Sequence, residues 1–179
     1  GEIEFVGQHK ADCRSLFDLQ QGGDLPLRVT HNDTKLNNVL LDERTMKGLC
    51  VIDLDTVMPG LSAHDFGDTV RFGANDCRED EEDQSKVHFL PQLYRVCERG
   101  FLSQAGEVLT AREKEVLRWG AKLMTLECGM RFLTDYLQGD VYFKIARPDQ
   151  NLDRARTQFT LVQQMEACWD ELAPEESKL

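Results

Sequence analysis

The chain has 179 residues, of which 41% are hydrophobic, and a chain of this size can bury the core of one compact domain. Its formal charge of −11 and its pI near 4.8 argue against a nucleic-acid or anionic-membrane partner, because both need clustered Lys and Arg. Phosphate ligands remain compatible with this charge, since bound magnesium can supply the positive charge that such a site needs. No apolar run approaches the roughly 20 residues of a membrane span, and no signal-peptide pattern opens the chain.

The six cysteines are widely scattered and form no C-x-x-C pair. A chain of this length needs no disulfide to stabilise it. We therefore expect reduced, mostly buried thiols in a cytoplasmic protein.

Short elements separated by turns are predicted for the first part of the chain. Residues 9–20 are predicted to form a short helix. Three apolar runs bounded by turn residues, 27–31, 38–42 and 49–55, are predicted to be strands of one small hairpin-rich patch. Residues 56–63 contain Pro and Gly and are expected to form a loop.

The rest of the chain has mainly helical periodicity. Helices are predicted to start near His64 and to span residues 85–104, 110–139 and 151–172, and the acidic stretch 77–84 is predicted to be a solvated surface loop. Thr110 and Glu113 form a capping box, Gly120 and Gly129 are points where the long helix could bend, and Asn151 is a plausible cap of the last helix. The prediction is one mostly helical α+β domain with a small β patch near its front.

The polar residues of that front lie in the stretch "THNDTKLNNVLLDERTMKGLCVIDLDTVMPG". Phosphoryl transfer needs a carboxylate that accepts the hydroxyl proton, oxygen ligands for magnesium, and a cation beside the transferred phosphate. Asp33 can be that carboxylate, and Lys35, on the same side of an extended loop, can reach the γ-phosphate. Asn38 and Asp53 offer the hard oxygen atoms that magnesium prefers.

The spacing His31-x-Asp33-x-x-x-x-Asn38 fits the H-R-D-L-x-x-x-N catalytic loop of kinases. The longer stretch "HNDTKLNNVLLD…VIDLDTVMPGLSAHDFGDTVRFGAN" resembles the aminoglycoside phosphotransferase and choline kinase superfamily, and within it most closely the bacterial N-acetylhexosamine 1-kinases. The resemblance is dense over residues 27–75 and weaker over 126–144. It implies a protein-kinase-like C-terminal lobe, with small β-hairpins carrying the catalytic loop. It also implies ATP and Mg²⁺ as co-substrate and cofactor, and the anomeric 1-OH of GlcNAc or GalNAc as acceptor.

The triplet Asp65-Phe66-Gly67 spells the metal-binding motif of protein kinases, but its spacing does not fit. In those enzymes the metal aspartate lies roughly 18 residues beyond the catalytic one. Asp53 lies 20 residues beyond Asp33 and Asp65 lies 32 beyond it. The resemblance implies that Asp53 binds the metal, and that Asp65 braces the catalytic loop through its backbone or through His31.

The resemblance further implies that four residues line the acceptor pocket, namely Phe72, Arg131, Tyr142 and Trp169. A sugar offers hydroxyl groups for hydrogen bonds and an apolar face for stacking on an aromatic ring. The alternative for each residue is an ordinary structural role, as a core aromatic residue or as a surface charge on a helix.

No G-x-G-x-x-G loop appears, and nothing before residue 27 can form a five-stranded nucleotide lobe. We therefore expect residues 1–179 to be a C-terminal lobe alone, which needs the N-terminal lobe of the same polypeptide and does not turn over ATP by itself. The alternatives are another acceptor (an aminoglycoside, choline or homoserine) and a non-catalytic sugar-binding lobe. A sulfatase is disfavoured because no Cys or Ser begins a C/S-x-P-x-R motif, and a metal-dependent phosphodiesterase because the four histidines are scattered.

Overall fold

The structure is a computed structural model, and it describes residues 1–174. The helices are α1 (Glu2–Gln8), α2 (Ser15–Gln21), α3 (Ser62–Gly73), α4 (Pro91–Ala105), α5 (Ala111–Glu115), α6 (Leu117–Leu137) and α7 (Gln150–Ala167). The strands are β1 (Arg28–Thr30), β2 (Val39–Leu41), β3 (Gly48–Val51) and β4 (Met58–Gly60), and short 3-10 helices are η1 (Asp12–Arg14), η2 (Leu36–Asn38), η3 (Leu54–Thr56) and η4 (Gln84–Lys86). The predicted α+β class, mainly helical with small sheets, is confirmed.

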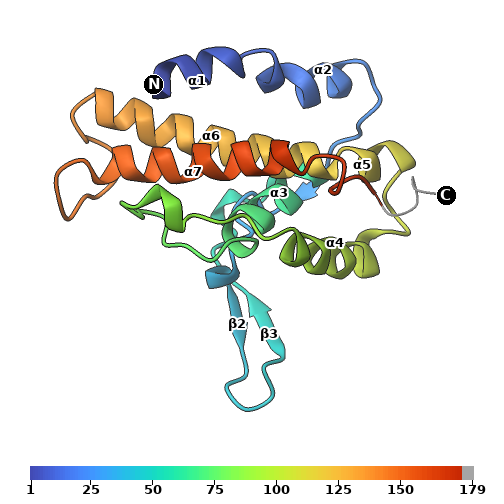
Figure 1. The fold of residues 1–179 in the computed structure, drawn as a ribbon. Helices are drawn as coiled ribbons and strands as arrows, with labels where there is room; N and C mark the ends of the chain where they lie inside the picture. Colours follow the sequence, from blue (N-terminus) through green and yellow to red (C-terminus); the bar gives the residue numbers. More distant parts are fainter. Residues whose placement is uncertain (175–179) are drawn as a thin grey trace.

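Helices α6 and α7 lie side by side through the middle of the molecule, with α1 and α2 on one side and α3 and α4 on the other (Figure 1). The contact between α3 and α6 is close because both helices place a glycine there. A Cβ atom on Gly67 would lie 2.2 Å from the carbonyl oxygen of Gly120, and one on Gly120 would lie 1.9 Å from that of Ala63. Only the absence of a side chain allows the backbones to approach this closely.

The core lies between these helices. Phe66 and Val70 of α3 pack with Tyr94 of α4, and all three are at most 1% exposed. A second cluster joins α6 to α7 through Leu126 and Phe159. The buried face of α3 thereby fixes the position of its opposite face, which supports the polar loop described below.

The strands form two separate two-stranded antiparallel sheets, so the prediction of a single β patch is wrong. Strand β1 pairs with β4, in which Pro59 lies opposite Val29. This corrects the predicted loop at 56–63; a proline is tolerated because β4 is an edge strand. Strands β2 and β3 form a hairpin, with Leu40 opposite Cys50, that projects away from the helices (Figure 1).

The helix boundaries also differ from those predicted. The segment 9–20 is not one helix, because the 3-10 helix η1 precedes α2, and α1 was not predicted. Helix α4 begins at Pro91 rather than at 85, since proline fits the first helical position and does not fit the helix interior. The long helix breaks at Val116, between α5 and α6, and not at either glycine. Helix α7 is capped at Asp149 rather than at Asn151, and it ends at Ala167.

None of the six cysteines forms a disulfide. The expectation of mostly buried thiols is wrong, because Cys13 and Cys50 are exposed and the other four are partly exposed. Within residues 1–174, no helix combines the length and the apolar character that crossing a bilayer requires.

Candidate active site

The loop of residues 31–38 connects β1 to β2, and helix α3 holds its backbone. The carboxylate of Asp65, in the first turn of α3, accepts hydrogen bonds from the backbone N–H groups of His31 and Asn32, both at 2.8 Å. The hydroxyl group of Thr34 donates to the carbonyl oxygen of Asp65 at 2.5 Å. Hydrogen bonds to an ionised carboxylate are stronger than neutral ones, so Asp65 fixes the backbone directly before Asp33.

The imidazole ring of His31 ties this loop to the segment that carries Asp53. Its Nε2 lies 3.0 Å from the carbonyl oxygen of Ile52, and its Nδ1 lies 3.3 Å from the backbone nitrogen of Asp33. A carbonyl only accepts and a backbone N–H only donates, so these contacts indicate the neutral tautomer with its proton on Nε2. One imidazole thus orients the loop and the neighbouring strand end together.

Asn32 turns the chain at the start of the loop, in a left-handed conformation with φ of 63°. Its side-chain Nδ2 donates to the carbonyl oxygen of Thr56 at 3.0 Å, and its Oδ1 accepts from the hydroxyl group of Thr30 at 3.0 Å. Asparagine tolerates this conformation better than most residues. The turn directs the Asp33 side chain toward Lys35 and Asn38.

Asp33, Lys35 and Asn38 form a compact polar group. Oδ2 of Asp33 accepts from Nζ of Lys35 at 2.7 Å and from Nδ2 of Asn38 at 2.8 Å. Burial raises the pKa of Asp33, but these two hydrogen bonds outweigh it, and the pKa lies below its ordinary value. At neutral pH the group therefore contains a carboxylate and an ammonium ion, and Oδ1 of Asp33 has no hydrogen-bond partner among residues 1–174.

Asp53 lies just after β3, with its backbone in the left-handed region at φ 64° and its side chain exposed. The backbone N–H of Ile52 donates to the carbonyl oxygen of Asn38 at 2.9 Å, which places the segment before Asp53 beside Asn38. The pKa of Lys35 is raised, first by the hydrogen bond to Asp33 and further by the charges of Asp53 and Asp68. These residues therefore share one electrostatic environment.

A groove of about 710 Å³ lies between α2, β4, the start of α3, and α6. Its lining is largely apolar, with five polar residues, namely Gln20, Asn32, His64, Glu127 and Arg131. Burial lowers the pKa of His64, and the charge of Asp65 only partly opposes this, so the imidazole is neutral at pH 7. A largely apolar groove with a few convergent polar groups is the usual form of a small-molecule site.

The structure brings two of the four expected acceptor residues together. The guanidinium of Arg131 lies 5.9 Å from the ring centre of Tyr142, and Arg131 lines the groove. Tyr142 itself does not line the groove, and neither does Phe72, which is 38% exposed two turns beyond Asp65 on α3. Trp169 does not line the groove, because it follows α7 and packs against Trp119 with ring centres 5.0 Å apart.

Asp68 is a residue near the catalytic loop that the sequence did not single out. It is 4% exposed, and Arg71 donates to its Oδ1 from both Nε and a terminal nitrogen at 2.9 Å. Its Oδ2 is buried and has no hydrogen-bond partner among the described residues. An unpaired buried carboxylate oxygen is rare in native proteins, and a bound ion or a catalytic role is one of its explanations. The signal was present in the spacing Asp65-x-x-Asp68, which places both carboxylates near one face of a helix.

The sequence model of the phosphotransferase enzyme family (APH) matches residues 4–97, just over half of the chain. The chain belongs to this family. The matched residues include both sheets, the loop at Asp33, and helix α3. The wider superfamily expected from the sequence is thereby confirmed, and the protein is a phosphotransferase of the APH kind. Arg131, Tyr142 and Trp169 lie outside the matched segment.

Proposed function

We propose that this phosphotransferase transfers the γ-phosphate of ATP, with Mg²⁺, to a sugar hydroxyl, and specifically to the anomeric 1-OH of an N-acetylhexosamine. The observation that carries the proposal is the state of Asp33. Lys35 and Asn38 hold one of its oxygens and leave the other for an incoming hydroxyl. The choice of N-acetylhexosamine rests on the sequence resemblance.

Asp33 orients the acceptor hydroxyl and accepts its proton through Oδ1. Because its pKa is lowered, the carboxylate is ionised at neutral pH and stays so in mild acid. Lys35 holds Asp33 in the present arrangement, and its ammonium exchanges to the transferred phosphate when nucleotide binds. His31 and Asp65 keep the backbone of the loop fixed during this exchange.

The residues present fit a magnesium ion. Nδ2 of Asn38 is engaged with Asp33, which leaves Oδ1 of the amide for a cation. Asp53 adds an exposed carboxylate from the neighbouring segment. Magnesium takes oxygen ligands of this kind, with one or two carboxylates, and when bound it neutralises charge on the phosphates.

The charge balance of the groove supports a neutral acceptor over an aminoglycoside. Asp68 is paired with Arg71 at 2.9 Å, and Glu127 is paired with Arg131 at 3.7 Å. Part of the acidic stretch 77–84 is also paired with cations, since Asp80 lies 3.6 Å from Arg78 and Glu79 contacts Arg71 of α3 and Arg154 of α7. Among the residues that line the groove, the acidic side chain is Glu127, and it is already paired, so a polycationic acceptor would find no free carboxylate in that lining.

The two tryptophans of the chain give no support for a choline site. A choline site uses an aromatic cage around a quaternary ammonium ion. Trp119 and Trp169 lie together, but the ammonium of Lys122 already occupies the space beside them, 5.2 and 5.7 Å from the two ring centres. Homoserine remains an alternative acceptor for the experiment below.

We further propose that turnover needs a nucleotide lobe that residues 1–179 do not supply. Within residues 1–174 the sheets have only two strands each, and a kinase-type nucleotide lobe needs a larger sheet with a Gly-rich loop. Large apolar side chains are exposed along residues 36–54, the segment that carries both proposed metal ligands, namely Leu36, Leu40, Leu49, Val51, Ile52 and Leu54. Exposed apolar surface of this kind is typical of a face that another domain covers.

The test is an acceptor screen with ATP and Mg²⁺ on the polypeptide that contains the nucleotide lobe. We expect N-acetylhexosamines to be phosphorylated at O1. Asp33→Asn is expected to lower kcat by about 100- to 10,000-fold, the range for loss of a general base, and Asp53→Asn by a similar factor. Asp42→Asn, at a partly exposed carboxylate in the β2–β3 turn, is the control that should leave kcat unchanged.

Two outcomes would contradict the proposal. One is near-normal activity of Asp53→Asn together with loss of magnesium dependence in Asp65→Asn. This result would assign the metal to Asp65 in place of Asp53. The other is an acceptor screen in which only aminoglycosides, choline or homoserine are phosphorylated. Brisk ATP-dependent phosphorylation by the 179-residue chain alone would contradict the need for a second lobe.

A further inference from the structure

A buried carboxylate holds the loop that follows α6. Asp135 is 3% exposed, and its Oδ1 accepts the backbone N–H groups of Val141 and Tyr142 at 3.0 and 2.8 Å. Its Oδ2 accepts the backbone N–H of Phe143 at 2.9 Å and Nδ2 of Asn151 at 2.9 Å. Three successive backbone groups of one loop thus bind a single side chain, and both of its oxygens are used.

This carboxylate is ionised at neutral pH. Burial would raise the pKa of Asp135, but the hydrogen bonds from the three backbone groups and from Asn151 outweigh it, and the pKa lies below its ordinary value. Asn151 is 0% exposed and also donates to Asp140 at 2.8 Å. The loop is therefore anchored from α7 as well as from α6.

The two side chains at the tip of the anchored loop, Val141 and Tyr142, are mostly exposed and bury little surface in the core. Val141 is 75% exposed and Tyr142 is 74% exposed. The turn before them contains two residues in the left-handed region, Gly139 at φ 92° and Asp140 at φ 57°. The buried carboxylate thus fixes the backbone on both sides of the loop tip: it seats Phe143, whose ring packs on Phe132 with centres 4.7 Å apart, and it holds the backbone under the exposed Tyr142.

The position of Tyr142 indicates what the anchored loop can contribute to the site. The ring of Tyr142 packs edge-on against Phe143 with centres 4.8 Å apart, and it lies beside the guanidinium of Arg131. Arg131 lines the groove that also contains Asn32, the residue before Asp33. An aromatic face beside an arginine is a surface on which a sugar ring can stack while its hydroxyls accept hydrogen bonds.

We infer that Asp135 is a positioning residue for the acceptor: it fixes the loop 141–143 so that Tyr142 stands beside Arg131, the residue that lines the groove. This inference rests on the proposed sugar acceptor. Asp135 touches neither the acceptor nor the reacting atoms, and it acts on affinity through Tyr142. It contributes nothing to the chemistry at Asp33.

The test is a double-mutant cycle on the affinity of the 179-residue chain for N-acetylglucosamine, measured by isothermal titration calorimetry. We expect Asp135→Asn and Tyr142→Ala each to weaken binding about tenfold, as for loss of one good contact. The double variant should bind within about twofold of Tyr142→Ala, because the anchor has no further effect once the ring is gone. Additive losses of about 100-fold, or unchanged affinity in Asp135→Asn, would overturn the inference.

Glu113→Gln is the matched control. Glu113 is also a buried carboxylate, 2% exposed, that binds an arginine and a backbone N–H, but it lies on α5 and does not line the groove. It should lower stability and leave the affinity for the sugar unchanged. A second measurement uses the wild-type chain, so it does not depend on the folding of any variant: saturating sugar should slow hydrogen exchange of the amides of residues 141–143. No slowing would overturn the inference.

The failure of this inference can be told apart from the failure of the proposed function. Sugar binding with the expected coupling, but without phosphate transfer in the acceptor screen, would contradict only the proposed function and leave a sugar-binding lobe. Sugar phosphorylation without coupling between Asp135 and Tyr142 would overturn only the inference. A wild-type chain that binds no N-acetylhexosamine would overturn the inference directly.

Discussion

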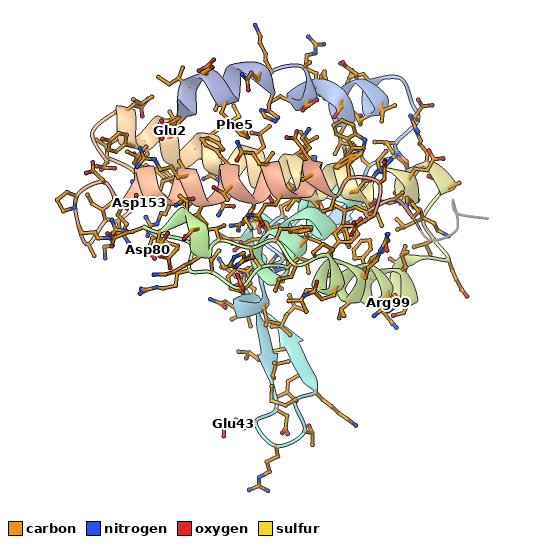
Figure 2. The ribbon with its side chains drawn as sticks, in the orientation of Figure 1. Glu2, Phe5, Glu43, Asp80, Arg99 and Asp153 are labelled. Carbon is orange, nitrogen blue, oxygen red and sulfur yellow. The ribbon has the colours of Figure 1, made fainter. Side chains whose placement is uncertain are left out.

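The catalytic loop and the β2–β3 hairpin are neighbours in the sequence, but they are held in opposite ways. The loop is bonded from several sides, by Asp65 below it, by Thr56 at the carbonyl oxygen of His31, and by Ile52 at the imidazole. The hairpin projects from the body, and the side chains around Glu43 at its tip lie apart from all the others (Figure 2). All four residues of β3 are exposed.

The difference matches the two halves of the proposed reaction. The half that handles the acceptor hydroxyl, with Asp33 and its partners, is fixed by contacts within this chain. The half that faces the phosphates, with Asp53 and the apolar hairpin, is exposed. Under the proposed function, preorganisation of the hydroxyl side therefore does not depend on the nucleotide, and the proposal requires another part of the protein to complete the phosphate side.

The largest effect expected in either the loop or the hairpin comes from removing the carboxylate that holds the loop. Asp65→Asn replaces one carboxylate oxygen by an N–H donor that faces a backbone N–H. We expect the free energy of unfolding to fall by about 3 kcal/mol, because a charged hydrogen bond is lost and a partly buried donor is left unpaired. Urea denaturation of the 179-residue chain measures this change.

The control for this variant comes from the hairpin itself. Asp42 makes the same kind of contacts, since its Oδ1 accepts the backbone N–H groups of Arg44 and Thr45 at 3.1 and 2.7 Å. These contacts lie in an exposed turn, where water replaces them, so Asp42→Asn should change stability much less. Equal effects of the two substitutions would show that the loop and the hairpin are held alike.

The next expected effect is on the pH dependence of stability, which tests how the strand before the catalytic loop is held. Both side-chain oxygens of Glu113 accept from Arg28 of β1, at 3.0 and 2.7 Å, so Glu113 anchors the strand that leads into the catalytic loop. Burial opposes ionisation, but the hydrogen bonds from Arg28, Thr110 and Ser62 outweigh it and lower the pKa of Glu113 from 4.5 to about 2. A lowered pKa stabilises the folded state above the unfolded value, and this contribution is lost as the pH falls from about 4.5 toward 2.

Glu113→Gln should therefore reduce the free energy of unfolding by about 2 kcal/mol at pH 7, since Arg28 is 34% exposed and stays partly hydrated. The difference from wild type should shrink as the pH is lowered from 5 to 2.5. Chemical denaturation at a series of pH values measures it. A difference that is constant over this range, or that grows in acid, would contradict the role of the ionised pair.

The catalytic loop was predictable because its residues are close in the sequence and their spacing is set by chemistry. His31, Asp33, Lys35 and Asn38 lie within eight positions, and the structure gathers them with Asp65 in one hydrogen-bonded group. The roles of these residues remain predictions. The apolar periodicity also identified the main helices, because each of them buries one face.

Contacts between distant positions could not be predicted from one sequence. Thr110 and Glu113 were expected to form a capping box, and they do, but nothing local indicated that Arg28 and Ser62 bind the same carboxylate. Strand β4 was missed because its proline and glycine indicated a loop, whereas its pairing with β1 is a tertiary contact. A glycine within a helix can indicate either a bend or a close approach by another helix. For the two glycines of the α3–α6 contact, the presence of the neighbouring helix decides for the close approach, and this is not visible in the local sequence.

The smallest expected effect concerns the apolar hairpin. Leu49 of β3 is 66% exposed, so Leu49→Gln should change the free energy of unfolding of the 179-residue chain by less than about 0.5 kcal/mol, as is usual for surface positions. Leu117, which is 1% exposed, is the matched buried leucine, and Leu117→Gln should lower stability by about 3 kcal/mol or more. In the polypeptide that contains the nucleotide lobe, Leu49→Gln should become destabilising, because the covered leucine then loses apolar contacts. An equal, negligible effect in both proteins would mean that the hairpin stays exposed, and the phosphate side of the site would then have to be completed elsewhere.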